Sequence, residues 1–128
     1  MDEPRVERET VVPASPDEVW EALTDGALLE EWLAPEVELD PREGGDVSVR
    51  LEDGEERSGT VEEVEEGRRL AFRWEREGVG ESYVELTVDA VAGGSRVVVV
   101  ETGPALVPAG GWGPRLTALC SASTLALA

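Results

Sequence analysis

Apolar and polar residues alternate through most of the chain, and this period-two pattern predicts a β-rich fold. In the range 46–51, valines and a leucine alternate with polar residues, and the pattern recurs in the ranges 70–75 and 83–88. Asp53-Gly54 predicts a two-residue hairpin, and Gly93-Gly94 predicts a later turn. Because parallel neighbours need crossovers of about a dozen residues or more, these short turns predict an antiparallel meander. The strands are expected at about residues 5–12, 37–39, 47–51, 57–64, 70–74, 84–88 and 97–100.

Two short helices are expected between the first strand and the meander. Ser15 can accept a hydrogen bond from the backbone N–H of Glu18, and Pro16 occupies the first helical position. Asp25 repeats the capping signal for a second helix. This second helix is expected to end at Ala34-Pro35, and its apolar stripe consists of Leu28, Leu29, Trp32 and Leu33.

The end of the chain changes from period two to helical spacing. Gly113-Pro114 opens a segment that contains no further Gly or Pro. A curved sheet with one apolar face must bury that face, and a long terminal helix is the element left to cover it. The predicted fold is therefore α+β, in the order β, α, α, six β, α, with about six or seven antiparallel strands. The helix is predicted from residues spaced three and four apart, namely Trp112, Leu116, Leu119, Cys120, Ser123 and Leu127.

The length and the hydropathy pattern indicate the domain organisation and the compartment. A chain of 128 residues predicts a single domain over residues 1–128. No apolar run approaches the roughly 20 residues that span a bilayer, and the charged start MDEPRVERE does not resemble a signal peptide. We therefore expect a cytoplasmic protein that does not associate with membranes.

The charged residues are strongly unbalanced towards acids. The chain has 29 Asp and Glu residues against 11 cations, and its net charge is −18. Because phosphate binding needs clustered Lys or Arg, this charge argues against nucleic acid as a partner. All of the cations are arginines. Two explanations of the acidic surface stay open, a coding bias, which we favour, and adaptation to high salt.

Several residue types that carry chemistry are missing. The chain has no His and no Lys, and Cys120 is its single cysteine. The usual ligands of zinc and haem, Schiff-base chemistry and the commonest general base are therefore absent. We predict no metal site and no cofactor, and we favour a binding protein over an enzyme. Cys120 lies in the apolar stripe of the last helix and is interpreted as a small core residue.

The order of the motifs resembles a known family. The pieces that match are the segment SPDEVWEALTD, Trp32, Gly44-Gly45, Gly59-Thr60-Val61, Arg69-Leu70 to Trp74, and Gly111-Trp112. Together they resemble the START-like helix-grip (SRPBCC) superfamily, in the branch named for the activator of Hsp90 ATPase homologue. The resemblance implies a Bet v-like curved sheet wrapped around a long C-terminal helix. It also implies a cavity between them, which in relatives often holds an apolar small molecule, but no single chemistry.

Glu101 is the candidate residue with the sharpest chemical interpretation. Alternation places it with Val97 and Val99, so an inward face would set an acid at the end of an apolar row. Such an acid suits proton transfer or the binding of a ligand's polar end. The alternative, which we favour, is a strand-end carboxylate in water. Tyr83 is the second catalytic candidate, although it is out of phase with Val84.

The remaining candidates are the groups expected near the cavity. Arg50 and Arg73 alternate out of phase with the apolar positions and are interpreted as exposed, although an internal arginine would pair with Glu101. Burial of one tryptophan contributes roughly 4 to 6 kcal/mol, so core anchoring accounts for most of the four tryptophans. The expected ligand-binding residues are Trp74, Trp112, Glu101, Phe72, Val99 and Leu116.

Three functions stay open at this point. The leading hypothesis is a domain that binds a small apolar molecule, because the chain lacks the usual set of acid, base and nucleophile. The second is a polyketide-cyclase-like or hydrolase-like enzyme that uses Glu101 or Tyr83. The third, implied by the resemblance alone, is an Hsp90-type chaperone ATPase co-regulator that acts through protein contacts.

The last segment of the chain predicts self-association. After Arg115 no charged side chain follows, whereas a solvent-facing helix normally carries a charged stripe. We expect a two-fold homodimer that covers Ala122, Leu125 and Ala126. Native mass spectrometry at micromolar concentration checks this prediction, and a monomeric mass would contradict it.

Overall fold

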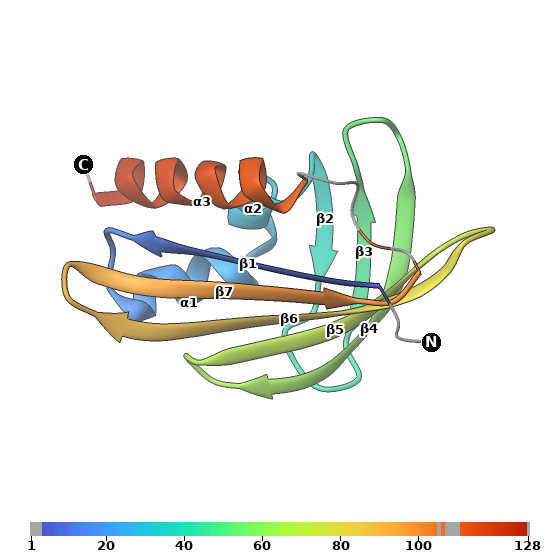
Figure 1. Cartoon of the computed structure of the whole chain (residues 1–128), viewed down its shortest axis with the longest axis horizontal. Coiled ribbons are helices and arrows are strands. Elements are labelled where there is room, and N and C mark those ends of the chain that lie inside the picture. The colour runs from blue at the N-terminus through green and yellow to red at the C-terminus, as the bar shows by residue number, and fades with distance from the viewer. Residues whose placement is uncertain (1–3, 105, 107–110, 128) are drawn as a thin grey trace.

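A seven-stranded antiparallel sheet curves around the helices, in the strand order β1-β7-β6-β5-β4-β3-β2 (Figure 1). The computed structural model describes residues 4–104, 106 and 111–127, the last six by their backbone alone. The expected element order and the α+β helix-grip class are confirmed. The elements are β1 (Arg5–Val12), α1 (Pro16–Thr24), α2 (Gly26–Leu29), β2 (Glu36–Leu39), β3 (Asp46–Arg50), β4 (Glu56–Glu65), β5 (Arg69–Arg76), β6 (Gly80–Val91), β7 (Gly94–Thr102) and α3 (Trp112–Leu127).

The first strand of the chain completes the sheet beside the last strand. Strands β2 to β7 follow one another as a meander, and β1 pairs with β7 in antiparallel register. Arg5 lies opposite Thr102, and Val12 lies opposite Ser95. Strand β7, which carries Glu101, therefore lies between β1 and β6 and joins β1 to the meander.

The apolar core lies on the side of the sheet where the helices gather (Figure 1). Helix α3 runs beside β1, and its residues Leu116 and Leu119 are buried. All four tryptophans are buried, as core anchoring requires. Among the described residues, none of the helices has the length and apolar character needed to traverse a lipid bilayer. The dimer contact predicted from Ala122, Leu125 and Ala126 involves side chains outside the described part of the chain.

Both expected N-caps are present. Ser15 Oγ accepts a hydrogen bond from the backbone N–H of Glu18 at 3.3 Å, so α1 begins where its sequence signal lies. Asp25 Oδ1 accepts from the backbone N–H of Leu28 at 3.1 Å and caps α2. The side chains at the two helix starts therefore satisfy donors that the helices themselves leave open.

The second helix is shorter than the sequence predicts. α2 ends at Leu29, and the backbone N–H of Trp32 donates to Leu29 O at 3.2 Å in a turn of the i to i+3 type. The reason lies in the tertiary packing of Trp32. Its indole N–H donates to Ala22 O of α1 at 2.9 Å, and this contact holds the segment after α2 against α1. The prediction of a helix up to Ala34-Pro35 is therefore wrong.

The hairpin between β3 and β4 is also wider than predicted. The backbone N–H of Leu51 donates to Glu55 O at 2.8 Å, which leaves three residues, 52–54, in the loop instead of two. Asp53 Oδ1 accepts from the backbone N–H of Glu55 at 2.8 Å. This side-chain bond forms an Asx-type turn and accounts for the extra residue.

Gly59 lies where β4 and β5 approach each other closely. It is paired with Trp74, and a Cβ atom placed on it would lie 1.7 Å from Arg73 O and 2.8 Å from Trp74 Cα. Only a hydrogen fits this gap. A register shift follows between Val61 and Glu63, so β4 bends at the place where the sheet wraps around the core.

Replacing Gly59 should therefore destabilise the sheet. We expect Gly59→Ala to lower the free energy of unfolding by about 2 kcal/mol or more, because the new methyl group collides with backbone atoms that cannot rotate away. Urea denaturation followed by tryptophan emission measures this loss. The matched control is Gly26→Ala, whose Cβ would lie 3.5 Å from Val37 O, an ordinary contact. Its expected change is within about 0.5 kcal/mol, and equal losses in the two variants would contradict the role given to Gly59.

Candidate functional site

Glu101 is a buried carboxylate on the inward face of β7. Its exposed fraction is 0%, and it shares this face with the buried residues Val97 and Val99. The interpretation of Glu101 as a strand-end carboxylate in water is therefore wrong. The reason is its position in the sheet, where β1 and β6 flank β7 and place Val6 and Val84 opposite Glu101.

Three neutral donors surround the carboxylate of Glu101. Its Oε2 accepts from Trp74 Nε1 at 2.9 Å and from Ser82 Oγ at 2.5 Å. Its Oε1 accepts from Trp112 Nε1 at 3.0 Å. Trp74 lies on β5, Ser82 on β6, and Trp112 is the first residue of α3. One side chain thus joins two strands and the terminal helix to β7.

The guanidinium of Arg57 supplies the positive charge for this site. Arg57 is 1% exposed, and its Nη1 lies 3.6 Å from Glu101 Oε2. It lies over the ring of Trp74, with 4.9 Å between the guanidinium carbon and the ring centroid. Its Nε donates to Glu55 at 3.0 Å, and Glu55 also pairs with Arg76 at 2.5 Å. Negative and positive side chains therefore alternate along this series of contacts, from Glu101 in the interior to Arg76 at the surface.

Arg57 and Ser82 are the members of the site that the sequence analysis missed. A signal for Arg57 exists, because alternation along β4 places it in phase with Gly59 and the buried Val61. Ser82 is likewise in phase with the buried Val84 on β6. Only the pairing of distant strands brings both residues to Glu101.

The aromatic side chains form the apolar part of the site. Trp74 and Trp112 stack with their ring centroids 6.4 Å apart at an interplanar angle of 20°. Phe72 meets Trp74 edge to face at 5.2 Å. Val99 and Leu116 are buried in the same core cluster. The structure therefore places all six expected ligand-binding residues in the interior, and direct contacts join Trp74, Trp112, Phe72 and Glu101.

Tyr83 does not belong to this site. Val84 is paired with Glu101 across the two strands, so Tyr83, one residue away, lies on the opposite face of the sheet. There Arg69 Nη2 donates to the Tyr83 hydroxyl at 3.4 Å. The two catalytic candidates, Glu101 and Tyr83, therefore do not share one site, because the strand period places them on opposite faces of the sheet.

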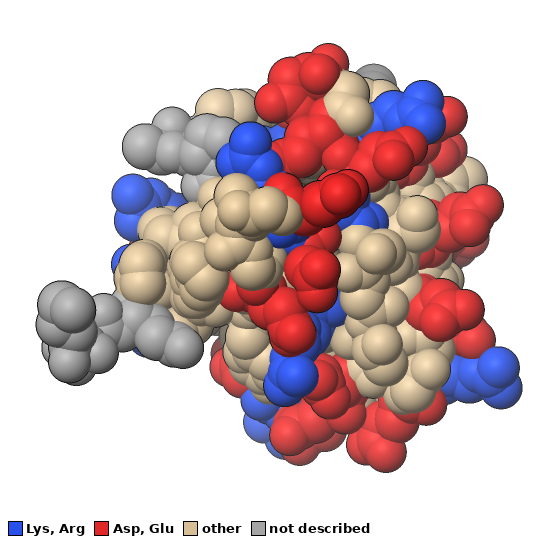
Figure 2. All heavy atoms as spheres, turned by 90° about the vertical axis from the view of Figure 1, so that its right-hand side faces the viewer, with Lys and Arg blue, Asp and Glu red and all other residues tan. Residues whose placement is uncertain are grey.

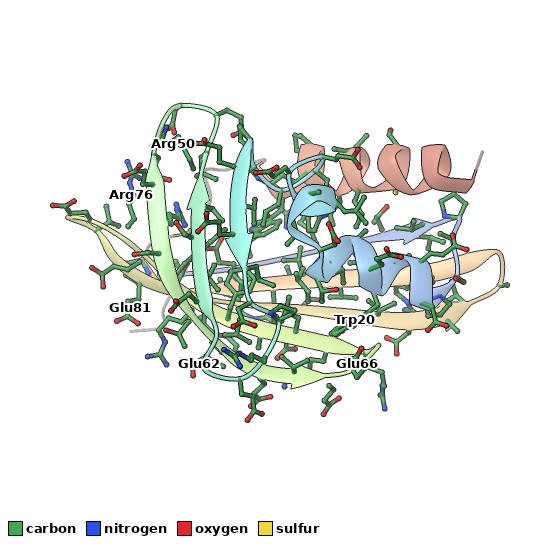
Figure 3. All side chains as sticks on the ribbon, turned by 180° about the vertical axis from the view of Figure 1, so that it is seen from behind. Trp20, Arg50, Glu62, Glu66, Arg76 and Glu81 are labelled. Carbon is green, nitrogen blue, oxygen red and sulfur yellow. The ribbon has the colours of Figure 1, made fainter. Side chains whose placement is uncertain are left out.

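The outer face of the sheet pairs each arginine with carboxylates. Arg73 lies 3.1 Å from Glu62 and 3.2 Å from Glu81, and Glu62 and Glu81 point away from the helices (Figure 3). Arg50 and Arg73 have half-exposed side chains, as their phase predicts. Carboxylates and arginines are intermingled over the face in Figure 2. Arg57, and not Arg50 or Arg73, is therefore the arginine that pairs with Glu101.

Cys120 lies on α3 beside the first strand. Cys120 is partly buried against the core, with its Sγ 3.4 Å from Thr10 Oγ1 and 3.6 Å from Val11 O. Within residues 4–104, 106 and 111–127, no group of three or more His, Cys, Asp or Glu is arranged to hold a metal ion.

Comparison with known proteins gives one family and several structural relatives. The family model described as activator of Hsp90 ATPase homolog 1-like protein matches residues 13–111. The crystal structure of protein MLL2253 from Mesorhizobium loti has a TM-score of 0.85 at 22% sequence identity, over 95% of this chain and 98% of its own. An identity this low shows the fold alone. No curated protein sequence gives a significant match.

Two relatives of somewhat higher identity are larger proteins. DynU16, a protein in the dynemicin biosynthetic locus, is 30% identical with a TM-score of 0.79, over 91% of this chain and 46% of its own. CalU16 from Micromonospora echinospora is 29% identical with a TM-score of 0.80, over 98% of this chain and 79% of its own. The chain therefore spans less than half of the length of DynU16.

The buried pair of Glu101 and Arg57 should be coupled far more strongly than a surface pair. We expect Glu101→Leu to lower the free energy of unfolding by about 3 to 5 kcal/mol, because it leaves the guanidinium of Arg57 buried beside an apolar group. Adding Arg57→Met should restore part of that loss. A double-mutant cycle in urea measures the coupling energy, which we expect to exceed about 1 kcal/mol.

The control cycle uses the exposed pair of Glu62 and Arg73. Its coupling energy should stay below about 1 kcal/mol, because solvent screens both side chains. Equal coupling in the two cycles would contradict the assignment of a buried ion pair at Glu101.

Proposed function

We propose, from the premise that the chain belongs to the family of activator of Hsp90 ATPase homolog 1-like proteins, that it binds a small, mostly apolar molecule between the sheet and α3. The apolar body of the ligand lies against Trp74, Trp112 and Phe72. Its polar group meets Glu101 and Arg57, which are buried charged side chains beside these rings. The proposal is supported by the helix-grip fold and by the composition of this interior.

The observation that carries the proposal is the burial of the pair of Glu101 and Arg57. A buried ion pair is weak evidence for stability, because well-packed apolar residues of similar volume are often as stable or more stable. Groups of this kind concentrate at functional sites. A charged pair set among tryptophans gives a site that recognises one polar group on an otherwise apolar molecule.

Trp112 is the side chain that a ligand has to move. Its ring fills the space over Trp74, and its indole N–H occupies Oε1 of Glu101. A ligand that enters between the sheet and the start of α3 takes over this stacking position. It also has to supply a donor to Glu101, because a buried carboxylate oxygen without a donor is costly.

A thermal-shift screen with defined probes tests the proposed binding. The probes are dodecanoic acid, 1-dodecanol, alizarin and cholesterol, which vary the polar group and the shape of the apolar body. Binding at one hundred times the dissociation constant stabilises a protein by about 2.7 kcal/mol, which raises the melting temperature of a domain of this size by several degrees. We expect a selective shift from one class of probe, together with a change in tryptophan emission.

The variants decide where the probe binds. Arg57→Met and Glu101→Gln should reduce the shift, each measured against the variant's own melting temperature, whereas the surface variant Arg73→Met should leave it unchanged. An equal shift in all variants would place the probe elsewhere. Failure of every class of probe on folded protein would remove the binding hypothesis and favour a protein partner.

An enzymatic role is the second candidate, and one observation favours it. The hydroxyl of Ser82 donates to Glu101 at 2.5 Å inside the core, where a carboxylate and a hydroxyl resemble a base with its proton source. Against it, Oε2 of Glu101 is already occupied by Trp74, Ser82 and the nearby Arg57. Under the enzymatic hypothesis, Glu101→Gln should abolish turnover of a candidate substrate, a loss far larger than the weakened binding expected above. A chaperone co-regulator role is supported by the family description alone, and co-purification of a partner tests it.

A further inference from the structure

A second groove lies on the surface, away from the Glu101 site. It has a volume of about 620 Å³, within the range of about 300 to 1,000 Å³ that small-molecule sites occupy. Two other grooves described on the sheet measure about 270 and 260 Å³. The segments that form it meet at the top of Figure 1, where α2, the start of β2 and the start of α3 lie together.

The floor of the groove is apolar. Pro35 and Pro114 are exposed on it, and Ala118 is partly exposed. Trp32 lies beneath, 4% exposed and fixed by its hydrogen bond to Ala22. The hydrocarbon chain or aromatic ring of a ligand can therefore displace water from this floor at little cost in free energy.

The rim of the groove is negatively charged. Glu30, Glu31 and Glu52 border it, against the single cation Arg115, which leaves a formal charge of −2. Glu30 and Glu31 are exposed, and Glu52 stands on the loop between β3 and β4. The groove thus combines an apolar floor with a rim that attracts positive charge.

The guanidinium of Arg115 is committed to the protein itself. It is 9% exposed, its Nε donates to Leu33 O at 2.8 Å, and its Nη1 donates to Gly111 O at 2.9 Å. Its Nη2 donates to both carboxylate oxygens of Glu52, at 3.1 and 2.9 Å. An anionic ligand would have to displace Glu52 and approach Glu30 and Glu31, so the rim disfavours anions.

We propose that this groove binds an organic cation with an apolar body, namely an amine carried on a hydrocarbon or aromatic group. The apolar body lies on Pro35, Pro114 and Ala118, and the ammonium group faces Glu31 and Glu30. A second copy of the chain, whose own net charge is −18, is a poor match for the acidic rim of this particular groove. The proposal concerns a site separate from the interior one and does not depend on it.

Nuclear magnetic resonance with three matched probes tests the proposal. The probes 2-phenylethylamine, 2-phenylethanol and phenylacetate share one ring and differ in charge. In ¹H–¹⁵N spectra, the indole signal of Trp32 and the amides of Gly111 and Ala118 report the groove, whereas the indole signals of Trp74 and Trp112 report the interior. We expect the amine alone to shift the groove signals in a saturable way.

Two charge variants complete the test. Glu31→Gln should weaken the binding of 2-phenylethylamine by about two- to fivefold, the effect of one exposed charge pair. Glu66→Gln removes the same charge on the turn between β4 and β5, far from the groove (Figure 3), and should leave the affinity unchanged.

Any of the following results would overturn the proposal. They are equal binding of the alcohol, preferential binding of phenylacetate, shifts confined to Trp74 and Trp112, and equal weakening by Glu31→Gln and Glu66→Gln. The third result would support the interior site and remove the groove, so the two proposals fail separately. Absence of any saturable shift from the amine would remove the groove site while leaving the interior site open.

Discussion

The hydrogen bonds and the ion pair of the Glu101 carboxylate are the interactions on which the arrangement of the interior depends. A buried acid is tolerated only where donors and a positive charge surround it. The donors here come from β5, β6 and α3, so the requirements of one side chain fix how the helix starts against the sheet. One turn later, Arg115 holds the same helix from outside through Leu33 and Glu52. Both polar anchors of α3 thus lie at its N-terminal end.

The sheet sorts the charged residues by face. Arg57 turns inward, where its charge is matched by Glu101 and Glu55. Outward-facing arginines lie between carboxylates, and the hydrogen bond from Arg69 to Glu85 raises the pKa of Arg69 above its ordinary value. Arg69 therefore keeps its charge, and the excess of acid lies on the surface. The net charge of −18 therefore has little effect on the pair of Glu101 and Arg57, because neighbouring arginines and the solvent screen the surface carboxylates.

Most of the fold could be predicted from periodicity and capping signals, because both depend on residues close together in the chain. The alternation of Val97, Val99 and Glu101 correctly gives one shared face, and Ser15 and Asp25 mark the helix starts. Local patterns do not show which face of a strand is covered by the other elements of the fold. The burial of Glu101 depends on its neighbouring strands and on α3, and the short α2 depends on the hydrogen bond of Trp32 to another helix.

The site itself was predicted only in part, for the same reason. Aromatic and apolar members could be named because their burial follows from composition and phase. Arg57 and Ser82 lie far from Glu101 in the sequence, and a charged residue in a strand is ordinarily assigned to the solvent. The strand period had already set Tyr83 out of phase with Val84, and the pairing of Val84 with Glu101 places the two candidates on opposite faces of the sheet.

The pairing of β1 with β7 has a consequence for how the chain reaches its folded state. About eighty residues separate these two strands, so a growing polypeptide cannot form their ladder until β7 itself has been made. Until then β1 has no partner, and strands β2 to β6 can assemble through short turns alone. The ladder between β1 and β7 closes a long loop, so it forms after the short-range pairing of the other strands. The unpaired backbone of β1 is therefore what a newly made molecule leaves open to association with others for the longest time.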